Sequence, residues 1–303
     1  MERPGALCIL EETMARSHTS VLALIVALVL STAQAQAPLP EAAAEALADG
    51  RARMAEALLT YPAQYPDRPL WQAAFADGRR ALSLAPEALE PVRFLAEAYS
   101  RSNWYGPAWN TWRDYVQRGG DVSADREAQQ LIADVGQELG YGAYARGDLE
   151  LALQYYQSVT DLVPSDLNAH VWSGRILIET ERPAQAIAFW ERVIELDPSD
   201  ARAAYFAELA REQARWGSAA VDAFREGVAF YEQQRLSEAA ERFARATARN
   251  PEYAQAWAWL GRVAYERERF GDAATYYRRA SALEPANETY AWFRTDSERR
   301  AGN

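Results

Sequence analysis

Residues 254–287 read AQAWAWLGRVAYERERFGDAATYYRRASALEPAN, and this stretch decides the fold. Large apolar, small and breaker residues occupy fixed places in it, namely Trp257, Leu260, Gly261, Phe270, Ala273, Tyr277, Ala280 and Pro285. The same order recurs in residues 220–253, immediately before it, and in two consecutive stretches, 133–166 and 167–200. A self-similar period of 34 residues predicts a helical array, in which each unit buries its apolar face only by stacking on a neighbour.

Small and large residues alternate between the two halves of each unit. The first half offers a small residue, namely Ala96, Gly140, Gly174, Gly227 or Gly261. The second half offers an Ala and, four residues later, a large aromatic, in the pairs Ala108/Trp112, Ala152/Tyr156, Ala186/Trp190, Ala239/Phe243 and Ala273/Tyr277. We expect the two small residues to face each other and to let the helix backbones approach. The aromatic side chains then pack against neighbouring helices and set the stacking angle.

These residues resemble the tetratricopeptide repeat family, whose signature is W-x₂-L-G…A-x₃-F/Y…P over 34 residues. The match is good over 133–198 and 220–287, weaker over 89–120, and limited to one helix, 69–86, before that. The resemblance implies an all-α fold, a right-handed α-solenoid of helical hairpins with about 14 helices. It also implies a non-catalytic module that binds a protein or peptide on a concave face lined by the first helix of each hairpin.

Residues 201–216, ARAAYFAELAREQARW, interrupt the period. They predict a single helix without a partner, because the next unit starts near Ala220 and not 34 residues after Ala201. We therefore expect two blocks. The first covers 38–216 and ends in this unpaired helix, and the second covers 218–303 and ends in a polar capping helix.

The N-terminus has the layout of a secretory signal peptide, predicted over 1–35. A ten-residue apolar run at 21–30 follows Arg16 and His18 and precedes two Ala-x-Ala sites. The run is too short to span a membrane, so we expect no stable span after cleavage at Ala35 and export to the periplasm, the cell envelope or the medium. The acidic leader before Met14 predicts that translation begins at Met14. An uncleaved signal anchor is the alternative.

Composition narrows the chemistry. The net charge is −11, and all 32 basic residues are Arg, so no Lys can act as a base, a Schiff-base former or a phosphate ligand. An acidic chain is also a poor partner for nucleic acid. His170 is the only histidine after the signal peptide, and we expect it to be packed. The sequence contains no metal-ligand spacing, phosphate loop or catalytic triad. We therefore predict no enzyme, no catalytic residue, no metal and no cofactor.

The resemblance assigns the groove to exposed positions of the first helices. These are Gln137, Tyr141, Tyr144, Asn168, Val171, Arg175 and Ile178 in the first block, and Phe224, Val228, Tyr231, Gln255, Arg262 and Tyr265 in the second. For three of them, Tyr144, Tyr231 and Tyr265, packing onto the next helix is the alternative interpretation. The family's clamp for a C-terminal carboxylate is not expected here, because it needs Lys, and Asn168 is the only Asn at a comparable place.

Three functions remain open at this point. The first is an exported adaptor or scaffold that binds an envelope protein through the groove. It fits the signal peptide, the repeats and the lack of catalytic motifs in the sequence. A structural subunit of an envelope or secretion assembly, and a module that binds cell-wall glycans through Trp and Tyr side chains, are the alternatives. The oligomeric state is open in all three.

The processing of the N-terminus is directly testable. N-terminal sequencing of the precursor and the mature protein should find a precursor that begins at Met14 and a mature chain that begins at Gln36. A mature protein that retains Met1 would contradict both expectations.

Overall fold

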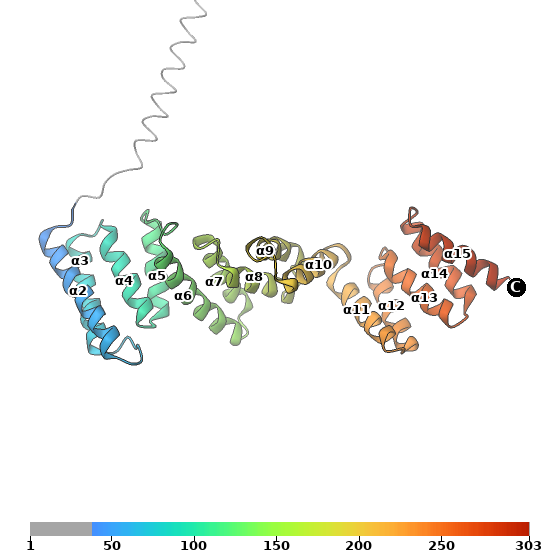
Figure 1. The fold of residues 1–303 in the computed structure, drawn as a ribbon, viewed down its shortest axis with the longest axis horizontal. Coiled ribbons are helices and arrows are strands. Elements are labelled where there is room, and N and C mark those ends of the chain that lie inside the picture. Colours follow the sequence, from blue (N-terminus) through green and yellow to red (C-terminus); the bar gives the residue numbers. More distant parts are fainter. Residues whose placement is uncertain (1–37, 303) are drawn as a thin grey trace, which may run out of the picture. The chain divides into compact units, whose positions relative to one another are not determined.

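The computed structural model describes residues 38–302, and its regular structure there is entirely helical (Figure 1). The fourteen helices are α2 (Glu41–Thr60), α3 (Pro69–Leu84), α4 (Leu89–Arg101), α5 (Tyr105–Gln117), α6 (Arg126–Ala145), α7 (Leu149–Leu162), α8 (Leu167–Glu179), α9 (Pro183–Leu196), α10 (Ala201–Trp216), α11 (Ser218–Glu232), α12 (Leu236–Arg249), α13 (Ala254–Glu266), α14 (Phe270–Leu283) and α15 (Glu288–Ala301). The predicted α-solenoid is confirmed. The predicted signal peptide and the start at Met14 lie outside the described residues.

The described chain divides into two compact units after residue 98, so the division falls within α4. In the first unit, α2 and α3 pack as a hairpin. Gly50 of α2 and Gly78 of α3 both lie against the ring of Phe94, so close that a Cβ atom at either would come within 2.9 Å of it. Arg53 and Asp77 form an ion pair between the two helices.

The second unit contains the repeats. Hairpins form between α6 and α7, α8 and α9, α11 and α12, and α13 and α14, while α10 packs on α9 and α15 packs on α14. Side-chain caps begin several of these helices: Asp148, Asp166, Asp200 and Asn287 each accept a hydrogen bond from a backbone N–H of the first turn. The boundary expected near Gly217 lies within this unit, and it stays a prediction.

The interruption at 201–216 is itself repeated. Helices α12, α13, α14 and α15 begin at residues 236, 254, 270 and 288, each 87 residues after α7, α8, α9 and α10, which begin at 149, 167, 183 and 201. The turns within the hairpins match as well, because Glu181 and Glu268 both adopt positive φ. The second unit therefore contains two copies of one arrangement, and α10 closes the first copy as α15 closes the second.

The glycine of each first helix in the two copies lies against an aromatic ring, and its expected approach to the Ala of the second helix stays a prediction. A Cβ atom placed on Gly140, Gly174, Gly227 or Gly261 would lie 2.6–2.8 Å from the ring of Tyr156, Trp190, Phe243 or Tyr277, respectively. Such distances are shorter than any tolerated carbon contact, so the glycine provides the space that the ring occupies. The ring comes 16 residues after the glycine in all four cases.

Each of these rings then stacks on an aromatic residue of the following helix, again 16 residues later. The stacked pairs are Tyr156–Trp172, Trp190–Phe206, Phe243–Trp259 and Tyr277–Phe293, with ring centroids 4.8–5.5 Å apart and interplanar angles of 4–29°. Such pairs contribute roughly 0.5–1.5 kcal/mol beyond the area they bury. We refer to each glycine with its two rings as a ring stack. Ring stacks connect every hairpin of the two copies to the next helix.

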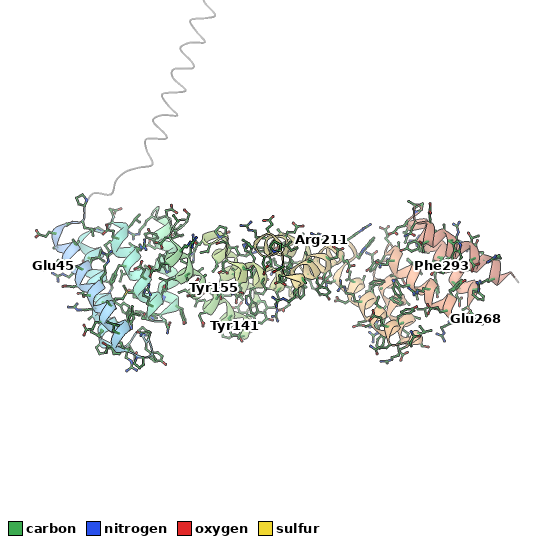
Figure 2. All side chains as sticks on the ribbon, viewed as in Figure 1. Glu45, Tyr141, Tyr155, Arg211, Glu268 and Phe293 are labelled. Carbon is green, nitrogen blue, oxygen red and sulfur yellow. The ribbon has the colours of Figure 1, made fainter. Side chains whose placement is uncertain are left out.

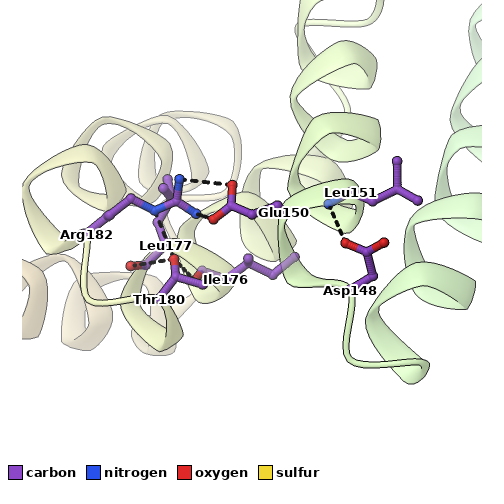
Figure 3. A network of polar contacts seen from close by, with 7 residues as sticks. All are labelled: Asp148, Glu150, Leu151, Ile176, Leu177, Thr180 and Arg182. Atoms are coloured by element: carbon purple, nitrogen blue, oxygen red, sulfur yellow. Dashed lines mark hydrogen bonds and ion pairs between the residues drawn. The ribbon is translucent and has the colours of Figure 1, made fainter.

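Polar contacts also join neighbouring hairpins. Arg182, in the α8–α9 turn, donates from Nη2 and Nη1 to the carboxylate of Glu150 at 2.7 and 3.2 Å (Figure 3). Its Nε donates to Thr180 Oγ1 at 3.0 Å, and that hydroxyl donates to the carbonyl of Ile176. This exposed pair ties the α7 hairpin to the next one. The second copy lacks it, because Ser237 stands 87 residues after Glu150. The ring stacks, which both copies share, are therefore the general connection.

Two glycines of one hairpin give a direct test of the ring stacks. Gly261→Ala should lower the free energy of unfolding by about 1–3 kcal/mol, because the new methyl group overlaps the Tyr277 ring, which Phe293 holds from the other side. The matched control is Gly271→Ala at the start of α14, where nothing lies within 4 Å. It should be neutral or stabilising by up to about 1 kcal/mol. Urea unfolding measures both, and equal stability of the two variants would contradict the assignment.

Candidate functional site

A four-residue cluster joins α6 to α8 on the first-helix face. Trp172 lies edge-on to Tyr144, with the ring centroids 5.0 Å apart, and the guanidinium of Arg175 lies 5.0 Å from the Trp172 ring. Arg175 Nε donates to Glu179 at 2.8 Å, and its Nη2 donates to the Tyr144 hydroxyl at 3.0 Å. That hydroxyl donates to the carboxylate of Glu179 at 3.0 Å. We call these four residues the N-terminal cluster.

The same four residue types recur 87 positions later, between α11 and α13. Tyr231 and Trp259 meet edge-on at 5.0 Å, and Arg262 lies 5.0 Å from the Trp259 ring. The Tyr231 hydroxyl donates to Glu266, and Arg262 Nε donates to the same carboxylate at 3.2 Å. We call this set the C-terminal cluster. In both clusters the acid and the Arg are one helical turn apart on the same first helix.

A third, similar cluster lies at the end of the array, with its acid and its Arg in exchanged positions. The Tyr265 hydroxyl donates to Asp296 at 2.6 Å, and Arg300 donates to Asp296 at 2.7 Å. Phe293 takes the place of the Trp, with its ring 5.4 Å from that of Tyr265. Here the acid stands where the other clusters have Arg, and Arg300 stands where they have Glu. The shared requirement is a tyrosine hydroxyl beside an ion pair.

The electrostatics of the clusters favour binding and give no reactive group. Burial, followed by the hydrogen bond to the neighbouring glutamate, raises the pKa of Tyr144 and of Tyr231 above the usual value. Both phenols therefore stay protonated at neutral pH, and each Arg keeps its charge beside a paired carboxylate. A neutral phenol and a paired guanidinium can position a ligand but cannot act as a base or a nucleophile.

A cavity adjoins each cluster. The first, about 420 Å³, lies between α8, α9 and α10, and its lining includes Val171, Arg175, Ile178, Trp190 and Phe206. The second, about 210 Å³, lies between α13, α14 and α15, and its lining includes Ala258, Trp259, Arg262, Tyr277 and Phe293. Val171 and Ala258, Arg175 and Arg262, Trp190 and Tyr277, and Phe206 and Phe293 are each 87 residues apart. We call them the first and second cavities. They are equivalent places in the two copies.

The structure places most of the predicted groove residues on the surface. Five are exposed, namely Tyr141, Asn168, Arg175, Gln255 and Arg262. Seven are half-buried, namely Gln137, Tyr144, Val171, Ile178, Val228, Tyr231 and Tyr265. Tyr141 is the most open aromatic among them, at 58% exposed (Figure 2). The prediction that Phe224 lies in the groove is corrected by the structure. It is only 6% exposed and packs against Phe243 and Tyr253, so it belongs to the core and cannot line a groove.

The cavities gather some of these residues and leave others out. Val171, Arg175 and Ile178 line the first cavity, and Gln255 and Arg262 line the second. Tyr144, Tyr231 and Tyr265 pack onto aromatic residues of the next first helix, as their alternative interpretation expected.

Sequence reasoning missed several residues of the site, namely Trp172, Glu179, Trp190, Arg202, Phe206, Trp259, Glu266 and Phe293. The spacing Tyr-x₂₇-Trp-x₂-Arg-x₃-Glu, present twice at an interval of 87 residues, is the signal that could have revealed four of them.

The remaining candidates are structural. His170 is buried, with Nε2 3.1 Å from the carbonyl oxygen of Pro164 and its ring 5.9 Å from that of Phe189. Burial lowers its pKa, so it is a neutral packed side chain at neutral pH. Within residues 38–302, no group of His, Cys, Asp and Glu could hold a metal ion. Over the same residues, every helix is too short or too polar to cross a bilayer.

Comparison with known proteins identifies the fold family. Two family models, each described as tetratricopeptide repeat, match residues 143–210 and 224–288. The chain is a tetratricopeptide repeat protein. Such proteins are generally non-catalytic interaction modules. The two matches fall on the two copies of the 87-residue arrangement, and each includes one cluster and most of its cavity. No curated protein matches the sequence.

Distantly similar solved structures include two of tetratricopeptide repeat proteins and one of PilF. One from Parabacteroides merdae is 13% identical, covers 86% of this chain and 100% of its own, and has a TM-score of 0.37. YrrB, described as a TPR protein with an unusual peptide-binding site, is 17% identical over 71% of this chain and 95% of its own, with a TM-score of 0.29. Pseudomonas aeruginosa PilF is 17% identical, covers 84% of this chain and 100% of its own, and has a TM-score of 0.28. At these scores we transfer none of their sites to this chain.

Proposed function

We propose that this tetratricopeptide repeat protein is a non-catalytic adaptor that binds a protein or peptide partner on its first-helix face. The observation that supports this most directly is the pair of matched clusters, each beside a cavity, at equivalent positions of the two copies. Packing of the hairpins alone would require only the ring stacks. It does not require the half-exposed Arg, its paired acid or the open cavity next to them.

The residue types of this face favour partner binding. Tyr, Trp and Arg dominate the binding energy of protein interfaces, because they combine apolar area with a polar end. Arg175 and Arg262 have side chains 50% and 51% exposed, and their ion pairs with Glu179 and Glu266 hold them in one position before a partner arrives. Preorganised donors of this kind reduce the entropic cost of association.

We further propose that the adaptor acts outside the cytoplasm. The apolar run at 21–30, the preceding Arg16 and the Ala-x-Ala sites support export, and all of them lie outside the described residues. The partner would then be another exported or envelope protein.

Partner capture tests the proposal. The mature protein should recover a specific partner from envelope extract, and the triple variant Tyr141→Ala, Arg175→Ala, Arg262→Ala should recover at least about tenfold less. The matched control is Arg211→Ala, which removes an Arg of similar exposure that pairs with Glu191 and Glu208 outside both clusters. Circular dichroism checks that each variant is folded. Undiminished capture by a folded triple variant would exclude this face as the binding surface.

A further inference from the structure

The first cavity has an apolar floor and room for a single side chain of a ligand. Val171, Ile178, Trp190 and Phe206 supply its apolar lining. Trp190 and Phe206 belong to a ring stack, with centroids 4.8 Å apart, so this floor is rigid. A volume of about 420 Å³ exceeds that of any single side chain and leaves room for part of the backbone that carries it.

The first cavity is twice as large as the second, and the copies differ at two positions beside these cavities. Ile178 stands where the second copy has Tyr265, and Tyr265 reaches across to donate its hydroxyl hydrogen bond to Asp296. Ile178 has no such reach, and it lines the first cavity. Arg202 stands where the second copy has Thr289, and each of these residues lines its own cavity. The first cavity therefore has both more room and one more cation.

The accessible charge at the rim of the first cavity is positive, although the chain as a whole carries −11. The side chains of Arg175 and Arg202 are 50% and 83% exposed, whereas those of Glu179 and Asp200 are 33% and 10% exposed. Asp200 is also engaged in starting α10, since it accepts a hydrogen bond from the Arg202 backbone N–H. An incoming group thus meets guanidinium hydrogens before it meets a carboxylate.

The guanidinium groups of Arg175 and Arg202 each have N–H donors that make no hydrogen bond to the described residues. Arg175 uses Nε and Nη2 for Glu179 and Tyr144, and Arg202 uses Nε and Nη2 for Asp200. Among the described residues, Nη1 of each Arg has no hydrogen-bond partner. A guanidinium offers five N–H donors, so each can donate to a second carboxylate while it stays bonded to the first.

We infer that the first cavity is the specificity pocket of this adaptor, and that it binds an extended acidic segment of the partner through one large aromatic side chain flanked by carboxylates. The aromatic ring lies on the floor of Trp190 and Phe206, and the carboxylates meet Arg175 and Arg202. The second cavity, half as large and without the second Arg, does not bind the same segment. This inference rests on the proposed function and specifies the chemistry of its partner.

Defined peptides test the inference without a known partner. The probe is acetyl-Gly-Ser-Glu-Phe-Glu-Ser-Gly-amide, compared by isothermal titration calorimetry with versions in which Lys replaces both Glu or Ala replaces Phe. The mature protein should bind one Glu-Phe-Glu peptide per chain, and each altered peptide should bind at least about tenfold more weakly. Failure of the Glu-Phe-Glu peptide to bind, equal binding of the Lys version, or two peptides per chain would overturn the inference.

The second copy supplies the variant that locates the peptide. Ile178→Tyr with Arg202→Thr gives the first cavity the residues that the fold already accommodates at 265 and 289, and it should weaken Glu-Phe-Glu binding by at least about tenfold. Arg211→Thr, on the same helix as Arg202, is the control and should bind as the wild type does. Unchanged binding by the double variant would overturn the inference.

Two further results keep the test decisive. If the double variant does not fold, Arg202→Thr alone changes only a side chain that is 83% exposed, and it should reduce the preference for Glu over Lys. An unchanged preference would overturn the inference. A negative peptide result together with intact partner capture by the wild type, lost in the triple variant described above, would reject this pocket while leaving the proposed function standing.

Discussion

The repeat array depends on one contact, an aromatic ring that lies where a glycine has no side chain. A methyl group on Gly140, Gly174, Gly227 or Gly261 would overlap the ring that faces it. Because the ring can approach the helix axis, its other face is presented to the next first helix, where a second aromatic stacks on it. The same three residues recur in each of the four ring stacks. Exposed ion pairs contribute less, since such pairs are worth about 0–1 kcal/mol.

The same rings connect the core to the surface. Trp172 stacks on Tyr156 within the array, and it also contacts Tyr144 and lies under Arg175 in the N-terminal cluster. Trp259 has the same double role in the second copy, through Phe243, Tyr231 and Arg262. The position of each Arg is therefore fixed by the packing of the repeat. The first-helix face is therefore positioned by the same rings that pack the repeats.

The two copies keep one scaffold while the residues beside their cavities differ. Helices α7 to α10 begin at residues that recur in α12 to α15 with a constant offset, and so do the ring stacks. Beside the cavities the copies differ at Ile178 and Tyr265 and at Arg202 and Thr289. Neither position supplies a ring of a ring stack. Specificity can thus differ between two places that share one architecture.

Much of this was predictable from the sequence, and the reasons for the remainder are physical. Period, proline punctuation and glycine positions predicted the helices, because these are local properties of the chain. The same pattern could not show that each glycine lies against a ring, since that depends on how two helices pack. Phe224 fails for a similar reason: its place in the repeat predicts the groove, but Tyr253 and Phe243 cover it. The clusters depend on pairs 28 to 35 residues apart, which only a comparison of the two copies would reveal.

The most direct measurement of the central contact is a double-mutant cycle on one ring stack. Tyr277→Leu, Phe293→Leu and the combined variant are compared with the wild type by urea unfolding. If the stacked rings hold the last hairpin to α15, the two substitutions are coupled by about 0.5–1.5 kcal/mol, and the double variant loses less stability than the sum of the single ones. Strict additivity would show that the rings stabilise their own helices independently, and it would contradict the account.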